Sequence, residues 1–166
     1  YGVLVVEVAT LSVCTDRTNA ERAMLIAAGA QEDNFITVPY DGTTDAALSA
    51  AGPIITANPG INNWVVVGCN DEGVLGVNNA LRNAAYEPAN VIAVGLGAYE
   101  ACRPWAEGID SGFKAALYIS GVDVGDAAAR ALGGFQGEVA CGADVDLVVD
   151  QHPLDRLAVR QPRAEG

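Results

Sequence analysis

Short runs of β-branched and aliphatic residues alternate along the chain with longer, alanine-rich stretches of helical periodicity. The apolar runs start near Val3, Phe35, Trp64 and Val91, a spacing of roughly 30 residues that matches one strand plus one helix. Such alternation is typical of a parallel sheet with crossover helices. The sequence therefore predicts an α/β fold, a doubly wound parallel sheet with helices on both faces.

The pattern also predicts where each element lies. Asp16 is expected to cap the first helix and Gly29 to end it, and Pro53 should bend the second helix or delay its start. Strands are expected at 3–9, 34–40, 63–68, 90–97, 111–119 and 145–151, and helices at 16–30, 41–60, 71–85, 98–108 and 123–135.

The amino-acid composition limits the classes of binding partner. The 166 residues suit one domain, and 21 acidic against 9 basic residues give a net charge of −12. Proteins bind nucleic acid and anionic membranes through clusters of Lys and Arg, and the sequence contains no such cluster. No apolar run approaches the roughly 18 residues of a membrane helix. We therefore expect neither nucleic-acid binding nor direct membrane insertion.

The cysteines and the histidine do not predict a metal or cofactor site. Cys14, Cys69, Cys102 and Cys141 are widely spread and form no C-x-x-C pair, so zinc spacing is absent. A disulfide among them is compatible with the sequence, which does not establish the pairing. His152 would serve a cysteine nucleophile only if the polar tail folded back over a strand end. We expect no metal and no cofactor.

In such sheets, ligands bind outside the carboxyl ends of the strands. The candidate site is therefore formed by residues 11–17, 40–41, 69–72 and 95–100. Arg17 offers five donors to hydroxyls or a carboxylate, and its alternative role is a surface ion pair. Asn70 and Asp71 follow a buried strand, where one can cap the next helix while the other faces a ligand.

A dinucleotide site is disfavoured. "AVGLGAYE" contains G-x-G after a strand, but Glu100 stands where the third glycine would be and would repel pyrophosphate. That carboxylate suits hydroxyl groups instead. Trp64, at the amino end of its strand, is expected in the core, and Trp105 in the core or at the rim of the site.

The chain resembles a known family. "DRTNAERAMLIAAG", "WVVVGCNDEGVLG", "VIAVGLGAYE" and "SGFKAALYI" follow one another as in the carboxyl-terminal lobe of the periplasmic sugar-binding proteins of ABC importers, most closely its arabinose-binding members. These type I receptors close two α/β lobes on a sugar. The resemblance implies a non-catalytic sugar-binding function, a transporter permease as partner, and an extracytoplasmic location, either periplasmic or as a cell-surface lipoprotein.

The resemblance also implies site residues. Arg17 and Asn70 match sugar-binding residues of the family, Glu100 stands at an acidic ligand contact, and Leu11 lines the site. Three positions depart from the family pattern: Cys69 replaces a methionine, Val13 a threonine, and Gly97 a second sugar-binding asparagine. The resemblance therefore points to a monosaccharide or polyol other than arabinose itself.

The family is about twice as long as this chain, with its amino-terminal lobe first. We expect residues 1–118 to form the sugar-binding lobe. Residues 119–166 would hold a crossover, a helix, a strand and a tail that normally pack with the missing amino-terminal lobe. The chain would then be a fragment, by expression or proteolysis. Mass spectrometry set beside the full reading frame tests this expectation.

Two other classes of function remain open. The effector domain of a LacI-like transcriptional regulator shares this lobe architecture but would need a basic DNA-binding module upstream. An enzyme on a doubly wound sheet is disfavoured because the sequence has no G-x-S-x-G, no P-loop and no metal cluster.

Overall fold

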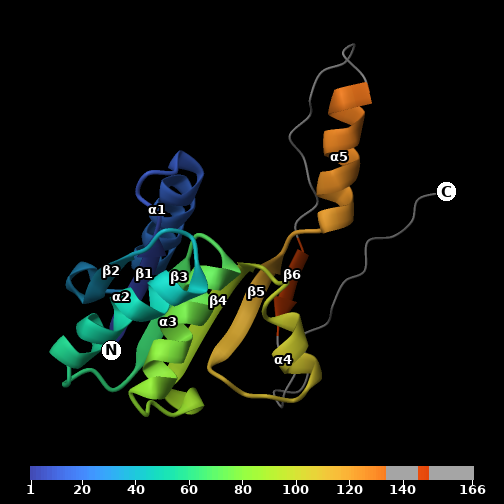
Figure 1. Cartoon of the computed structure of the whole chain (residues 1–166). Coiled ribbons are helices and arrows are strands. Elements are labelled where there is room, and N and C mark those ends of the chain that lie inside the picture. The colour runs from blue at the N-terminus through green and yellow to red at the C-terminus, as the bar shows by residue number, and fades with distance from the viewer. Residues whose placement is uncertain (134–145, 150–166) are drawn as a thin grey trace.

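A computed structural model describes residues 1–133 and 146–149. Its centre is one sheet in the order β2-β1-β3-β4-β5-β6 (Figure 1). The first five strands are parallel, and β6 adds to the edge antiparallel to β5. The strands are β1 (Gly2–Glu7), β2 (Phe35–Pro39), β3 (Trp64–Gly68), β4 (Val91–Gly97), β5 (Phe113–Tyr118) and β6 (Asp146–Val149).

A helix follows each of the five parallel strands, which confirms the predicted α/β class. Short 3₁₀ turns at Glu32–Asn34 and Pro88–Asn90 precede β2 and β4. The helices are α1 (Ser12–Ala27), α2 (Thr44–Ala57), α3 (Asp71–Asn83), α4 (Cys102–Ala106) and α5 (Gly121–Gly133).

The sheet is apolar on both faces, as a doubly wound sheet requires. Alternate residues of β1 point to opposite sides. Val3 and Val5 pack in a small cluster with Leu25 of α1, while Leu4 and Val6 join the large core under α2 and α3. Trp64 is 1% exposed in that large core, so its predicted core role is confirmed.

The ends of α1 agree with the prediction in one of two places. Asp16 does not cap α1, which already begins at Ser12 without a side-chain cap, so Asp16 lies inside the helix. Gly29 does end it: with φ +102° it follows the C-cap, and Gly29 and Ala30 donate back to Ile26 and Leu25.

Helix α2 runs through Pro53. It begins at Thr44, capped by the Thr43 hydroxyl, which accepts from the amide of Ala46. Of the two predicted alternatives, a bend or a late start, the late start is wrong, because this cap fixes the first turn well before the proline.

The last elements lie at and beyond the edge of the sheet. The strand expected at 145–151 is present as β6, which pairs with β5 because the open edge of β5 offers unpaired backbone groups. Its packing with a missing amino-terminal lobe stays a prediction. Helix α5 projects from the rest of the fold (Figure 1), and its residues 121–130 are all exposed. Cys141 and His152 lie outside the described residues.

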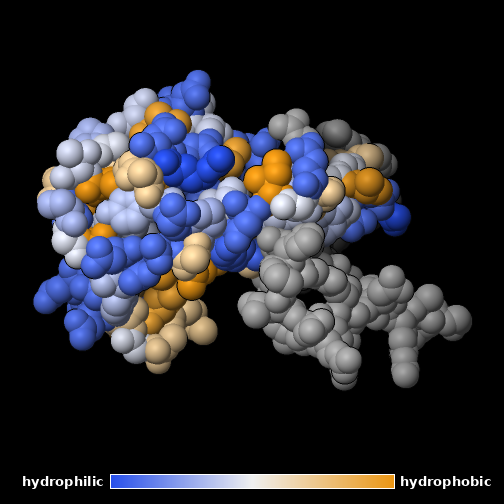
Figure 2. Space-filling view, turned by 90° about the horizontal axis from the view of Figure 1, so that it is seen from below, coloured by the Kyte–Doolittle hydropathy of each residue, from blue (hydrophilic) through white to orange (hydrophobic). Residues whose placement is uncertain are grey.

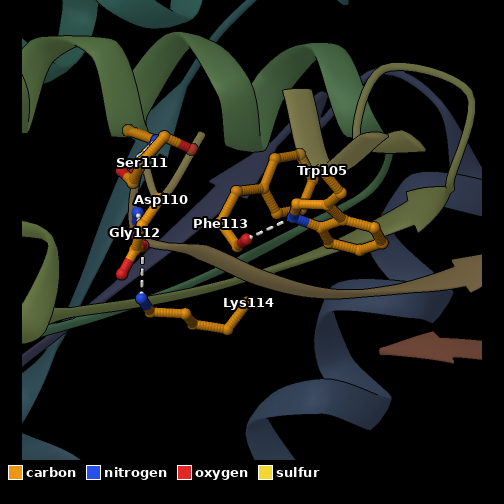
Figure 3. A network of polar contacts seen from close by, with 7 residues as sticks. Trp105, Asp110, Ser111, Gly112, Phe113 and Lys114 are labelled. Atoms are coloured by element: carbon orange, nitrogen blue, oxygen red, sulfur yellow. Dashed lines mark hydrogen bonds and ion pairs between the residues drawn. The ribbon is translucent and has the colours of Figure 1, made fainter. Parts of the chain in front are cut away.

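Helix α4 is anchored on β5 by an aromatic contact. The indole nitrogen of Trp105 donates to the carbonyl of Phe113 at 2.8 Å, and the two rings meet edge to face (Figure 3). Lys114 pairs with Asp110 in the loop before β5. Trp105 thus packs against the core, the first of its two predicted roles.

On the face seen from below in Figure 1, the described residues are coloured by hydropathy in Figure 2. Among the described residues there, hydrophilic side chains dominate and apolar ones lie in separate spots (Figure 2). Within the described ranges, none of the helices is both long and apolar enough to span a bilayer.

The α2–α3 contact depends on Gly76. A Cβ built there would lie 2.3 Å from the carbonyl oxygen of Thr44 and 2.7 Å from Cβ of Ala47. We expect Gly76→Ala to lower the free energy of unfolding by about 1–3 kcal/mol, because overpacking outweighs the gain in helix propensity. Urea unfolding measures this change.

Gly125→Ala is the matched control, since its Cβ would meet nothing within 4 Å in α5. It should leave stability unchanged or raise it slightly. Equal effects of the two substitutions would contradict the close-packing explanation.

Candidate functional site

Residues 69–72, at the junction of β3 and α3, accept hydrogen bonds from the ends of the other strands. The carbonyl of Cys69 and the side chains of Asn70, Asp71 and Glu72 each accept one such bond. The donors come from α1, from the end of β2 and from the loop after β4. The four predicted strand-end segments therefore meet at one edge of the sheet.

Helix α1 is linked to this junction by a hydrogen bond and by a disulfide. Nη1 of Arg17 donates to the carbonyl of Cys69 at 2.9 Å. One turn earlier on α1, Sγ of Cys14 forms a disulfide with Sγ of Cys69, with 4.8 Å between the Cα atoms. The guanidinium therefore lies near Asn70, the residue after Cys69, and no other described residue accepts a hydrogen bond from it.

The side chain of Asn70 has its oxygen fully used. Oδ1 accepts from the hydroxyl of Tyr40 at 2.6 Å and from the amide of Gly73 at 2.9 Å, so Asn70 is the N-cap of α3. Among the described residues, its amide nitrogen reaches only the carbonyl of Gly42, at 3.5 Å. The amide nitrogen of Asn70 can therefore donate to a ligand, while the two bonds to Oδ1 fix the orientation of the side chain.

Burial raises the pKa of the Tyr40 phenol to about 12, with the nearby Glu72 carboxylate adding to the rise. This phenol therefore stays protonated at neutral pH and keeps donating to Asn70.

Asp71 positions the loop that carries Glu100. The carboxylate is 0% exposed, and Oδ2 accepts from the backbone amide of Glu100 at 3.1 Å. Burial raises the pKa of Asp71. The side chain of Glu100 is exposed, and no other described residue bonds its carboxylate. Glu100 thus presents acceptors at the rim.

The same loop has an unusual backbone. Gly97 and Ala98 have φ of +130° and +63°, so the chain turns sharply after β4. The hydroxyl of Tyr99 donates to Oε2 of Glu72 at 2.7 Å, and the residue is 54% exposed. Burial, followed by the bond to Glu72, raises the pKa of Tyr99.

The remaining predicted residues lie at the same edge. Leu11 and Val13, at the start of α1, are each 50% exposed and can offer apolar contact. Cys69 is 3% exposed and its sulfur is bound to Cys14. It therefore has little exposed surface for the expected contact with a ligand.

Glu21 is a partly buried acid near Arg17. It lies one turn further along α1, and Oε2 has no hydrogen-bond partner among the described residues. Burial raises the pKa of Glu21 to about 7, against the lowering effects of Arg17 and of a backbone hydrogen bond at Gly68.

Cys14 and Tyr99 lie inside the predicted site segments 11–17 and 95–100, but the sequence assigns no role to either of them. Glu21 lies outside those segments, although its i, i+4 spacing from Arg17 on a helix indicates that the two are close, as a surface ion pair would require. No local signal could have paired Cys14 with Cys69, which are 55 residues apart.

The site can hold a polar, uncharged ligand by donors from Arg17 and Asn70 and acceptors from Glu100. Within the described ranges, no group of three or more histidines, cysteines or acids could hold a metal ion. The arrangement thus offers hydrogen bonds and apolar contact.

Comparison with known proteins finds relatives that are binding proteins. No family model matches the chain. An ABC transporter L-arabinose-binding periplasmic protein from Azospirillum brasilense is 32% identical over 111 residues, 66% of this chain and 33% of the relative. The chain thus spans about a third of that protein's length.

Solved structures share the fold. A periplasmic solute-binding protein of an ABC transporter from Actinobacillus succinogenes 130z, with bound D-allose, has a TM-score of 0.63 and 19% identity, covering 90% of this chain and 53% of that one. A LacI family transcriptional regulator from Arthrobacter sp. FB24, in complex with lactose, has a TM-score of 0.59 and 23% identity, covering 80% and 46%.

The fold is one lobe of the type I periplasmic binding protein fold. Over part of its length the chain is homologous to the arabinose-binding proteins of that family. Those relatives are binding proteins and not enzymes, in agreement with the sequence-based prediction.

The disulfide should contribute strongly to stability. It closes a loop of 55 residues, for which chain entropy predicts about 4 kcal/mol. We expect Cys14→Ser to lower the free energy of unfolding by several kcal/mol, as measured by urea unfolding without reductant. Cys102→Ser, at an exposed free cysteine, is the control. Equal unfolding midpoints for both variants would refute the link.

Glu21 should make stability depend on pH. Its folded pKa, about 7, is above the ordinary value of 4.5. The folded state therefore binds more protons between these values, and stability falls as pH rises through that window. Relative to wild type, Glu21→Gln should gain of order 1–2 kcal/mol between pH 4.5 and pH 8. Denaturation of both proteins across this range measures the difference, and parallel pH profiles would contradict it.

Proposed function

We propose that the chain is the carboxyl-terminal, sugar-binding lobe of a solute-binding protein that delivers its ligand to an ABC transporter permease outside the cytoplasm. The observation that supports this most directly is the convergence of Arg17, Asn70 and Glu100 at one edge of the sheet. Donors and acceptors at separate points suit a ligand with several hydroxyl groups, each of which donates and accepts.

The ligand we propose is a monosaccharide or related polyol. Leu11 and Val13 give exposed apolar surface beside the polar groups, as the C–H edges of a sugar ring require. Gly97 offers no side chain to a hydroxyl, so the set of hydrogen bonds is smaller than in the arabinose-binding pattern. A different sugar from arabinose fits this smaller set better.

The second half of the site would come from an amino-terminal lobe of the same protein. Helix α5 supports this, because Val122 and Val124 on it are 79% and 49% exposed and would be covered by such a lobe. Without it, much of the ligand stays in water and affinity should be weak.

The test is an NMR titration of the chain with pentoses, hexoses and polyols, a method that tolerates millimolar affinity. Arg17→Lys should weaken binding of the preferred sugar about tenfold or more, because lysine lacks the planar fork of donors. Arg82→Lys, at an exposed arginine in the last turn of α3, should leave binding unchanged. Binding to none of the sugars would overturn the proposal.

The second candidate is an effector domain of a LacI-like regulator, favoured by the similarity of fold to the lactose-bound regulator. The encoded sequence upstream of Tyr1 distinguishes the two functions. A secretion leader and a first lobe support the receptor, and a basic helix-turn-helix segment supports the regulator.

A further inference from the structure

Tyr99 occupies the space that Gly97 leaves open. A Cβ built on Gly97 would lie 2.1 Å from Cε1 of Tyr99 and 2.7 Å from Cδ1. No side chain fits at position 97 while the ring stays there. The aromatic ring of Tyr99 therefore fills the space that a side chain at position 97 would occupy.

The ring is held in this position and still faces water. Its hydroxyl donates to Oε2 of Glu72 at 2.7 Å, which ties the loop after β4 to the first turn of α3. The next residue, Glu100, is fixed by its amide on the buried Asp71. An oriented aromatic residue that remains 54% exposed has surface left for a ligand.

We propose that Tyr99 is a ligand-contacting residue that sets the specificity of this site. Its ring would pack on an apolar C–H face of the sugar or polyol whose hydroxyls are bound by Arg17, Asn70 and Glu100. The proposal rests on the sugar-binding function proposed above. It implies that the site prefers ligands with an unsubstituted C–H face, because a hydroxyl pressed on the ring would lose its hydrogen bonds.

The experiment uses the 166-residue chain and the same panel of pentoses, hexoses and polyols, including epimers. Tyr99→Ala should weaken the preferred sugar about three- to tenfold and reduce the discrimination between epimers. Tyr99→Phe keeps the ring and should stay within about twofold of wild type.

Tyr1→Ala is the matched control. Tyr1 is 52% exposed and its hydroxyl accepts from the amide of Gln31, but it precedes β1 at the opposite edge of the sheet. Its loss should change neither affinity nor the order of sugars. A purely structural role of Tyr99 would lower stability and leave that order unchanged.

A second readout needs no variant. Addition of the preferred sugar should shift the ring resonances of Tyr99 and leave those of Tyr1 in place. If wild type binds a sugar but the Tyr99 resonances and the Tyr99→Ala affinities stay unchanged, this inference is wrong while the proposed function stands. If wild type binds no sugar, the proposed function fails first.

Discussion

The structure depends on the convergence of hydrogen bonds on the junction between β3 and α3. Backbone and side-chain oxygens of Cys69, Asn70, Asp71 and Glu72 accept from groups in α1, at the end of β2 and in the loop after β4. Parallel strands bring their carboxyl ends to one edge, but only specific donors fix the loops relative to one another. The junction thus provides the framework on which the candidate binding groups are arranged.

This framework explains why one residue can serve both stability and binding. Asn70 caps α3 and accepts from Tyr40, and its amide nitrogen is thereby aimed by bonds made to its oxygen. The buried Asp71 carboxylate accepts from the backbone amide of Glu100 and so fixes the position of this exposed residue. A ligand that meets such a site finds groups already oriented, which lowers the entropy lost on binding.

The junction also brings charged groups together. Asp71 and Glu72 belong to it, and the guanidinium of Arg17 is bonded to it through the carbonyl of Cys69. Glu21, near Arg17, has a pKa near 7 because burial outweighs that cation. The disulfide between Cys14 and Cys69 holds α1, and with it Arg17, against the end of β3.

The sequence by itself determined the strand and helix order, the core role of Trp64 and the edge of the sheet where Arg17, Asn70 and Glu100 meet. These follow from local periodicity and from the rule for parallel strands, which need no knowledge of distant contacts. Tertiary structure decided the Cys14–Cys69 pairing, the burial of Glu21, the place of Tyr99 over Gly97 and the pairing of β6 with β5. Each depends on which residues far apart in the chain, or on opposite sides of a turn, come within a few ångströms, and local patterns do not encode that distance.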